Sequence, residues 1–327
     1  MDRSELRDRM LADVGAETHD LDVGGVRTSV IEAGDGPPLV LLHGAIECGG
    51  IIWSPVVSDL AQRCRVIVPD VPGLGESDPL ERLDLEAFST WFEELLHAAH
   101  VQRPTLVAHS LLGTMAARYA SREGSQLERV VISAAPGVGP YRMPWKLKYV
   151  AVRFAIRPTP RNAERFDRFA LYDLDAIRAR NRDWWDAFEM YNRIQARRHH
   201  VKKTMNRLIA DQAKSIDRGD LARIDVPVTL LWGLHDRMVP LSVGQAAAVD
   251  HGWPLHVIDG AAHAPQIETP QEFVATLAAL GGEHPARDTR RGSAPELERS
   301  SPTTPIRHPD DASSRDVHRP RGDPARD

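Results

Sequence analysis

The chain has 327 residues, of which 42% are hydrophobic and 27% are charged, and its formal net charge at pH 7 is -5. This length allows one large domain with a sizeable core, and the slightly acidic balance gives no indication of a nucleic-acid partner. We expect a cytoplasmic protein without a disulfide framework, because the N-terminus is charged, only two cysteines occur and no stretch approaches the roughly 18 apolar residues of a membrane span.

Short β-branched runs bounded by Pro, Gly or Asp alternate with segments of helical spacing over most of the chain. After an N-terminal extension over residues 1–18, the turn at Gly24-Gly25 predicts an antiparallel hairpin. Strands are expected before this turn and over residues 26–34, 38–44, 65–73, 104–110, 129–137, 226–233 and 254–263. Helices are expected over residues 53–62, 85–100, 111–123, 242–250 and 270–280. The alternation predicts an α/β fold with a mostly parallel central sheet of about eight strands, covered by helices on both faces.

The alternation is interrupted between residues 138 and 222, after the sixth predicted strand. This stretch has helical spacing and is rich in aromatic residues, and strand character returns at Val226. It carries about 19 Lys and Arg against about 10 Asp and Glu, so it is basic although the whole chain is acidic. We interpret it as an all-helical cap, or lid, inserted between two parts of the core, residues 19–137 and 223–280.

The last segment, residues 281–327, is rich in Pro, Arg, Asp and Ser and contains no aromatic residue. Such a composition buries too little apolar surface to offset the entropy of ordering. We therefore expect a disordered tail.

Residues that could take part in catalysis stand at the ends of four predicted strands. Ser110 stands between a strand and a helix, where a hydroxyl is exposed beside free backbone N–H groups. His263 follows the last strand and can accept the serine proton, and Asp236 follows the preceding strand and can orient that histidine. The turn over residues 43–45 can offer a further backbone N–H to an oxyanion. Taken singly, these residues also fit a helix N-cap, an ordinary exposed histidine and a turn residue.

Taken together, five motifs resemble the α/β-hydrolase superfamily over roughly residues 20 to 280. They are LHGAIECGGIIW, PDVPGLGESD, LVAHSLLG, LLWGLHDRMVP and GAAHAPQIETP, in that order along the chain. The resemblance implies Ser110 as nucleophile, Asp236 as acid and His263 as base. It also implies an oxyanion hole made by the backbone N–H groups of Ala45 and Leu111.

Other residues near these motifs are weaker candidates. His109 is adjacent to the serine and His43 lies at a turn, so a structural role is expected for both. Asp70 in PDVPGLGESD also follows a strand, and in the superfamily the corresponding aspartate usually braces the next loop.

The serine motif differs from the superfamily pattern G-x-S-x-G, because Ala108 and Leu112 replace both glycines. Ala108 adds only one methyl group, whereas Leu112 is much larger. Gly113 follows at once and can relieve crowding between helix and strand. A distortion of the turn, if there is one, is therefore expected at Leu112.

The implied reaction is acyl transfer on a small-molecule substrate, without a metal or an organic cofactor. We favour hydrolysis of a carboxylic ester of an apolar or aromatic molecule. Hydrolysis of a carbon-carbon bond, a biosynthetic tailoring reaction, and low-turnover ligand binding for signalling stay open as alternatives. The basic cap is either a solvated face or a source of arginines for a substrate carboxylate, the candidates being Arg142, Arg193, Arg197 and Arg198. The sequence does not indicate an oligomeric state.

Overall fold

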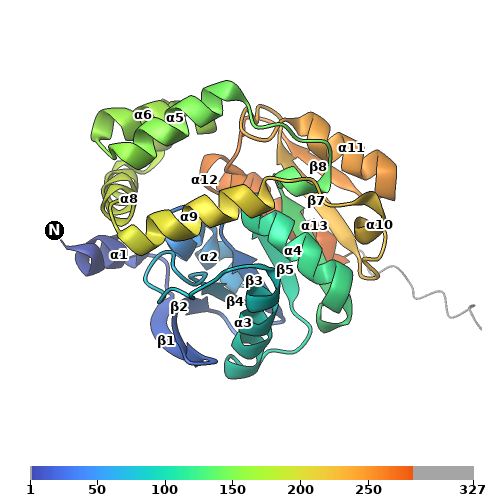
Figure 1. Cartoon of the computed structure of the whole chain (residues 1–327). Coiled ribbons are helices and arrows are strands. Elements are labelled where there is room, and N and C mark those ends of the chain that lie inside the picture. Colours follow the sequence, from blue (N-terminus) through green and yellow to red (C-terminus); the bar gives the residue numbers. More distant parts are fainter. Residues whose placement is uncertain (1, 283–327) are drawn as a thin grey trace, which may run out of the picture. The chain divides into compact units, whose positions relative to one another are not determined.

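A single eight-stranded sheet forms the centre of the computed structural model, which describes residues 2–282 (Figure 1). Its strands are β1 (Glu17–Val23), β2 (Val26–Ala33), β3 (Pro38–Leu42), β4 (Arg65–Pro69), β5 (Thr105–His109), β6 (Arg129–Ser133), β7 (Val228–Gly233) and β8 (Leu255–Ile258). They pair in the order β1-β2-β4-β3-β5-β6-β7-β8. The pairs β1/β2 and β2/β4 are antiparallel and the other five are parallel. The predicted α/β class and the antiparallel hairpin are confirmed.

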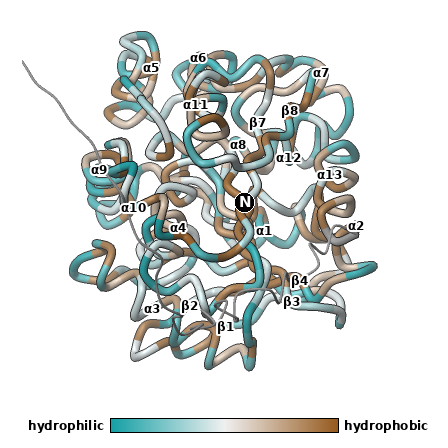
Figure 2. Tube along the Cα trace, turned by 90° about the vertical axis from the view of Figure 1, so that its right-hand side faces the viewer, coloured by the Kyte–Doolittle hydropathy of each residue, from teal (hydrophilic) through white to brown (hydrophobic). Residues whose placement is uncertain are grey.

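Helices cover both faces of the sheet because the inner strands are apolar on both sides. In β3, Val40 and Leu42 join one core cluster, while Leu39 and Leu41 join the other. The first cluster packs under α3 (Leu85–Ala98), α4 (Ser110–Glu123) and α11 (Leu241–His251). The second packs under α2 (Ser54–Ala61) and α13 (Pro270–Gly282). Figure 2 shows apolar residues along β3 and β4 and hydrophilic residues in many outer turns.

Short helical turns complete the core. They are η1 (Gly49–Trp53), η2 (Gly124–Gln126), η3 (Pro136–Val138) and α12 (Pro265–Glu268). The helix expected over residues 53–62 is therefore α2 preceded by the 3-10 turn η1.

Six helices stand between β6 and β7, as expected for an all-helical insertion after the sixth strand (Figure 1). They are α5 (Trp145–Ile156), α6 (Pro160–Ala170), α7 (Leu174–Arg180), α8 (Arg182–Gln195), α9 (His199–Gln212) and α10 (Arg218–Leu221). Capping side chains fix several starts: Thr159 accepts from Asn162 N–H, and Asn181 accepts from Trp184 N–H. Residues up to 283 form one compact unit, so the borders of cap and core stay predictions.

The predicted N-terminal extension contains a helix that sequence analysis missed. This helix, α1 (Arg3–Leu11), begins with a capping box in which Asp2 accepts from Glu5 N–H and Glu5 accepts from Asp2 N–H. Leu6 and Met10, four residues apart, are buried in the second core cluster, and α1 packs against α8. β1 begins at Glu17, and the border of the extension at residue 18 stays a prediction.

Three predicted strands end four or five residues earlier than expected. β4 ends at Pro69, β6 at Ser133 and β8 at Ile258. After β6 and β8 the chain leaves the sheet at Ala134 and Gly260, whose φ angles of 49° and 69° are left-handed and incompatible with a strand. The predicted tail lies outside the described residues, except that residues 281 and 282 finish α13.

The start of α4 lies close to the sheet at Gly113. A Cβ added there would lie 2.9 Å from the Ala108 carbonyl oxygen and 2.9 Å from the Ala135 Cβ. Leu112 is fully buried in the first core cluster. The small residue that this contact requires therefore stands at position 113, and the expectation that any distortion of the turn falls at Leu112 stays a prediction.

We predict that Gly113→Ala lowers the free energy of unfolding by about 1 to 3 kcal/mol, because the new methyl group meets backbone and Ala135 with no room to move. Urea unfolding followed by circular dichroism measures the change. Ser121→Ala on the same helix is the control, with an expected change within about 0.5 kcal/mol. Equal stability of the Gly113→Ala variant and the natural protein would contradict the packing argument.

Candidate active site

Ser110 occupies a strained turn between β5 and α4. Its φ of 57° is left-handed, which is uncommon for a residue other than glycine. The residue is half-buried, and α4 begins at it. The first N–H groups of a helix have no intrahelical partner and lie at the positive end of the helix dipole. The turn thus places the hydroxyl beside polar groups that suit a negative charge.

The structure brings Ser110, His263 and Asp236 into one chain of hydrogen bonds. The Ser110 Oγ lies 2.9 Å from His263 Nε2, and His263 Nδ1 lies 2.8 Å from Asp236 Oδ2. The other carboxylate oxygen of Asp236 accepts from the N–H groups of Met238 and Val239 at 2.8 and 2.9 Å. This geometry suits an imidazole that accepts a proton from the hydroxyl while the carboxylate stabilises its charged form.

The loop after β3 packs directly against the start of α4. A Cβ on Gly44 would lie 3.2 Å from Ser110 Cβ and 2.8 Å from His109 Nδ1. Ala45 follows Gly44, and Leu111 follows Ser110 in the first turn of α4. The two residues expected to supply oxyanion N–H groups therefore flank the serine on two different segments, and their role stays a prediction.

The two other histidines of the region have structural contacts. His109 Nε2 lies 2.6 Å from the His263 carbonyl oxygen, and burial lowers the pKa of His109 to about 3, so this imidazole is neutral and donates. His43 is fully buried, which lowers its pKa, and its Nε2 accepts from the N–H of Val71 at 3.0 Å. Its Nδ1 lies 2.6 Å from the Gly44 carbonyl oxygen.

Glu268 in α12 is a residue of the site that sequence analysis missed. One oxygen of its buried carboxylate accepts from the N–H groups of Ala262 and Ala264, on either side of His263, at 3.0 and 2.9 Å. The other oxygen accepts from the N–H of Tyr172 in the cap at 2.6 Å. Burial raises the pKa of Glu268, while these donors lower it. The signal in the sequence was the glutamate within the histidine motif GAAHAPQIETP.

The cap contacts both loops that carry the acid and the base. The N–H of His263 donates to the Ala170 carbonyl oxygen at 3.1 Å. Arg237, next to Asp236, donates to the carbonyl oxygens of Arg168 and Leu171 at 2.9 and 2.6 Å. The short segment of the cap between α6 and α7 is therefore part of the scaffold of the site.

The four cap arginines that were candidates for a substrate carboxylate are Arg142, Arg193, Arg197 and Arg198. Arg193 forms an ion pair with Glu189 at 2.8 Å. Arg198 donates to the Gly75 carbonyl oxygen at 3.1 Å and to Gln195 Oε1 at 2.8 Å. Arg142 and Arg197 are exposed, and Arg197 donates to the Pro158 carbonyl oxygen at 3.5 Å. Arg193, Arg197 and Arg198 are thus engaged within the protein, which favours the interpretation of the cap as a solvated and internally paired surface.

Other kinds of site were sought in residues 2–282. No group of three or more His, Cys, Asp or Glu side chains in this range is arranged to hold a metal ion. No helix among these residues combines the length and the apolar character needed to cross a membrane. A cavity of about 480 Å³ lies between α1, α2, α7, α8 and α13, and neither Ser110, Asp236 nor His263 lines it.

We predict that Glu268→Ala lowers the free energy of unfolding by about 3 kcal/mol, because two buried N–H donors and the part-buried N–H of Tyr172 lose their acceptor. Glu268→Gln keeps one oxygen acceptor and should cost less. Urea unfolding measures both variants, and Glu272→Ala at an exposed position of α13 is the control. A Glu268→Ala variant as stable as this control would refute the bracing role.

Comparisons with known proteins show the family to which the chain belongs. The family described as alpha/beta hydrolase fold matches residues 37–270. The chain is 27% identical to the pimeloyl-(acyl-carrier protein) methyl ester esterase of Aeromonas hydrophila, over 75% of this chain and 96% of that protein. It is 28% identical to the 2-hydroxy-6-oxononadienedioate/2-hydroxy-6-oxononatrienedioate hydrolase of Paraburkholderia xenovorans, over 76% and 89% of the two chains.

A solved structure of similar fold is the carboxylesterase CesB of Bacillus subtilis. The TM-score is 0.74 at 20% sequence identity, and the match covers 86% of this chain and 98% of that one. The family match spans every strand from β3 to β8. The chain therefore belongs to the α/β-hydrolase fold family and is a hydrolase.

Proposed function

We propose that the protein is a serine hydrolase that cleaves a carboxylic ester of a small molecule through an acyl-enzyme. The observation that carries the proposal is the hydrogen-bonded chain from Ser110 through His263 to Asp236, at 2.9 and 2.8 Å. The likeness to two esterases adds support. The two cysteines are free thiols, which agrees with the cytoplasmic location that we propose from the sequence.

In the proposed mechanism Ser110 Oγ forms a bond to the carbonyl carbon of the ester while its proton passes to His263 Nε2. The negative oxygen of the tetrahedral intermediate accepts from the N–H groups of Ala45 and Leu111. His263 then returns the proton to the leaving alcohol as the ester bond breaks. A water molecule attacks the acyl-enzyme by the same route, which releases the acid and restores the serine. The carboxylate of Asp236 stabilises the imidazolium in both halves of the reaction.

Two acidic residues lie close in sequence to residues of the proposed site. Glu47 follows Ala45 by two residues, and Asp167 precedes Ala170, the partner of His263 N–H, by one helical turn. Neither carboxyl group forms an ion pair with another described residue. Burial raises the pKa of Glu47 to about 7. Burial, with the carboxylates of neighbours that include Glu47, raises the pKa of Asp167 to about 8.

These acids bear on the choice between ester hydrolysis and carbon-carbon bond hydrolysis. The relative from Paraburkholderia xenovorans is named for a dioate, a substrate with two carboxylates. We infer that both acids border the substrate site, where they would repel such a substrate once they ionise. We therefore propose an ester with an uncharged acyl group rather than a dicarboxylate.

We predict that a fluorophosphonate probe labels the protein once per chain, and that Ser110→Ala abolishes the label. Turnover of nitrophenyl esters should fall by about 1000-fold or more, because the nucleophile is lost. Intact mass spectrometry and initial rates measure the two effects. Ser121→Ala, which changes another serine of α4, should retain both label and turnover. A natural protein with neither label nor turnover would refute the proposed function and favour ligand binding without catalysis.

We predict that discrimination against a carboxylate-bearing ester increases with pH. Between pH 6 and 9, Glu47 and Asp167 pass from mainly neutral to negative, while the ester carboxylate is charged throughout. The ratio of kcat/KM for a neutral ester to that for its carboxylate analogue should rise about tenfold, ~1.4 kcal/mol. The Glu47→Gln/Asp167→Asn variant should flatten this rise, and Glu164→Gln on the cap surface should not. A ratio that is flat in the natural protein counts against the acids as neighbours of the substrate.

A further inference from the structure

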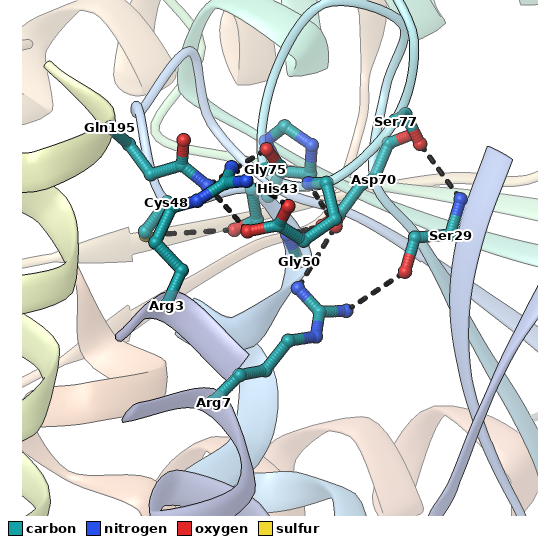
Figure 3. Close-up of polar contacts among 12 residues, drawn as sticks. Arg3, Arg7, Ser29, His43, Cys48, Gly50, Asp70, Gly75, Ser77 and Gln195 are labelled. Atoms are coloured by element: carbon teal, nitrogen blue, oxygen red, sulfur yellow. Dashed lines mark hydrogen bonds and ion pairs between the residues drawn. The ribbon is translucent and has the colours of Figure 1, made fainter. Parts of the chain in front are cut away.

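The N-terminal helix α1 precedes the family match, which begins at residue 37, yet it inserts a charged group into the protein interior. Arg7 is only 5% exposed. Its guanidinium donates to the Asp70 carboxylate at 3.0 Å and lies 3.4 Å from the Ser29 hydroxyl (Figure 3). Burial disfavours the charged guanidinium, but Asp70 and Tyr191 together hold the pKa of Arg7 above its ordinary value. The guanidinium is therefore charged at every pH at which the protein is folded.

Asp70, which has no exposed surface, connects this arginine to two loops. Its Oδ1 accepts from the N–H of Gly50 at 2.5 Å, and its Oδ2 accepts from the N–H of Glu76 at 2.9 Å as well as from Arg7. Gly50 ends segment 43–50, and Glu76 lies in segment 70–78. Figure 3 shows Arg7 pointing from α1 toward Asp70, between the two segments.

The other end of segment 43–50, at His43, is hydrogen-bonded to the residue that follows Asp70. The N–H of Val71, directly after Asp70, donates to His43 Nε2 at 3.0 Å. Both ends of the segment that carries Ala45 are thus hydrogen-bonded to residues 70 and 71. Gly44 in this segment packs against Ser110 and directly precedes Ala45, so the segment held by residues 70 and 71 also borders the serine.

Segment 70–78 is also tied to the cap. Tyr191 on α8 donates to Glu76 Oε1 at 2.7 Å, and Gln195 donates to the Gly75 carbonyl oxygen at 2.8 Å. Arg7 is neither donor nor acceptor in these two hydrogen bonds, although it also interacts with Tyr191. What is lost when Arg7 is replaced is the counter-charge of a buried carboxylate, and a carboxylate without its partner takes up a proton or draws in water.

We propose that Arg7 is a positioning residue for the oxyanion hole: through Asp70 it sets the place of segment 43–50, and hence of the Ala45 N–H beside Ser110. This proposal rests on the proposed ester hydrolysis. It makes α1, which lies outside the family match, a part of the catalytic apparatus. The effect should fall on the transition state, in which the oxyanion exists, and not on binding of the neutral ester.

The test compares Arg7→Met with the natural full-length protein on a nitrophenyl ester and on its thionoester, in which sulfur replaces the carbonyl oxygen. A sulfur anion accepts hydrogen bonds weakly, so the ratio of the two kcat/KM values reports how well the oxyanion donors are aligned. Arg9→Met is the matched control on α1, because it removes an exposed ion pair with Asp183 and touches neither segment.

We expect Arg7→Met to lower kcat about 10- to 100-fold with KM changed less than about threefold, and the ester-to-thionoester ratio to fall about tenfold. Arg9→Met should leave all three quantities unchanged. Arg7→Lys keeps the charge but loses the contact with Ser29, so it should give a smaller change in the same direction. Near-ultraviolet circular dichroism establishes whether each variant is folded. If Arg7→Met is unfolded, the kcat and the ester-to-thionoester ratio of Arg7→Lys test the positioning role instead.

Failure of the positioning role and failure of the proposed hydrolysis give different results. An unchanged kcat and thionoester ratio in a folded Arg7 variant overturns the positioning role, and the proposed hydrolysis then still holds if the natural protein turns over esters. A lower kcat with an unchanged ratio assigns Arg7 to general stability and also overturns the role. A natural protein without fluorophosphonate labelling or ester turnover overturns the proposed function and this inference with it.

Discussion

The left-handed backbone of Ser110 is the constraint on which the site depends. At a φ of 57° the chain turns from β5 into α4 within one residue, so the hydroxyl faces His263 while the first N–H groups of the helix lie beside it. Such a turn brings α4 close to the sheet, and Gly113 supplies the space that this requires. The strain is sustained by packing on both sides, since Gly44 and Leu112 are buried against the same turn.

Two buried carboxylates hold the loops that face this turn. Glu268 accepts from the backbone on both sides of His263, and Asp70 accepts from segments 43–50 and 70–78. Each is in contact with an element beyond the central sheet: Glu268 with Tyr172 of the cap, and Asp70 with Arg7 of α1. Loops without regular structure need such acceptors, because their buried N–H groups have no strand or helix partner. The precision of the site therefore depends on groups that take no part in the proposed chemistry.

The sequence predicted the sheet, the insertion after the sixth strand and the meeting of Ser110, Asp236 and His263, because parallel strands end at one edge and the motifs mark those ends. The roles of Arg7 and Glu268 could not be predicted from the sequence. Arg7 pairs with Asp70, 63 positions away, and Glu268 accepts from the backbone of Tyr172, and neither contact leaves a local sequence pattern. The helix α1 was missed for a related reason. Its only buried apolar residues are Leu6 and Met10, so its stability comes from tertiary packing and its capping box.

The net charge of the cap does not indicate the charge of the groups that a ligand can reach. The cap has an excess of basic residues, yet Arg193 and Arg198 are bound to groups of the protein, and the acidic Asp167 stands next to the segment that contacts His263. Ion pairs with neighbouring acids remove arginines from the set available to a ligand, whereas a buried acid without an ion pair keeps its influence in a region of low dielectric constant. In the proposed site, selectivity for substrate charge would therefore depend on Glu47 and Asp167, the two acids to which we assign this role.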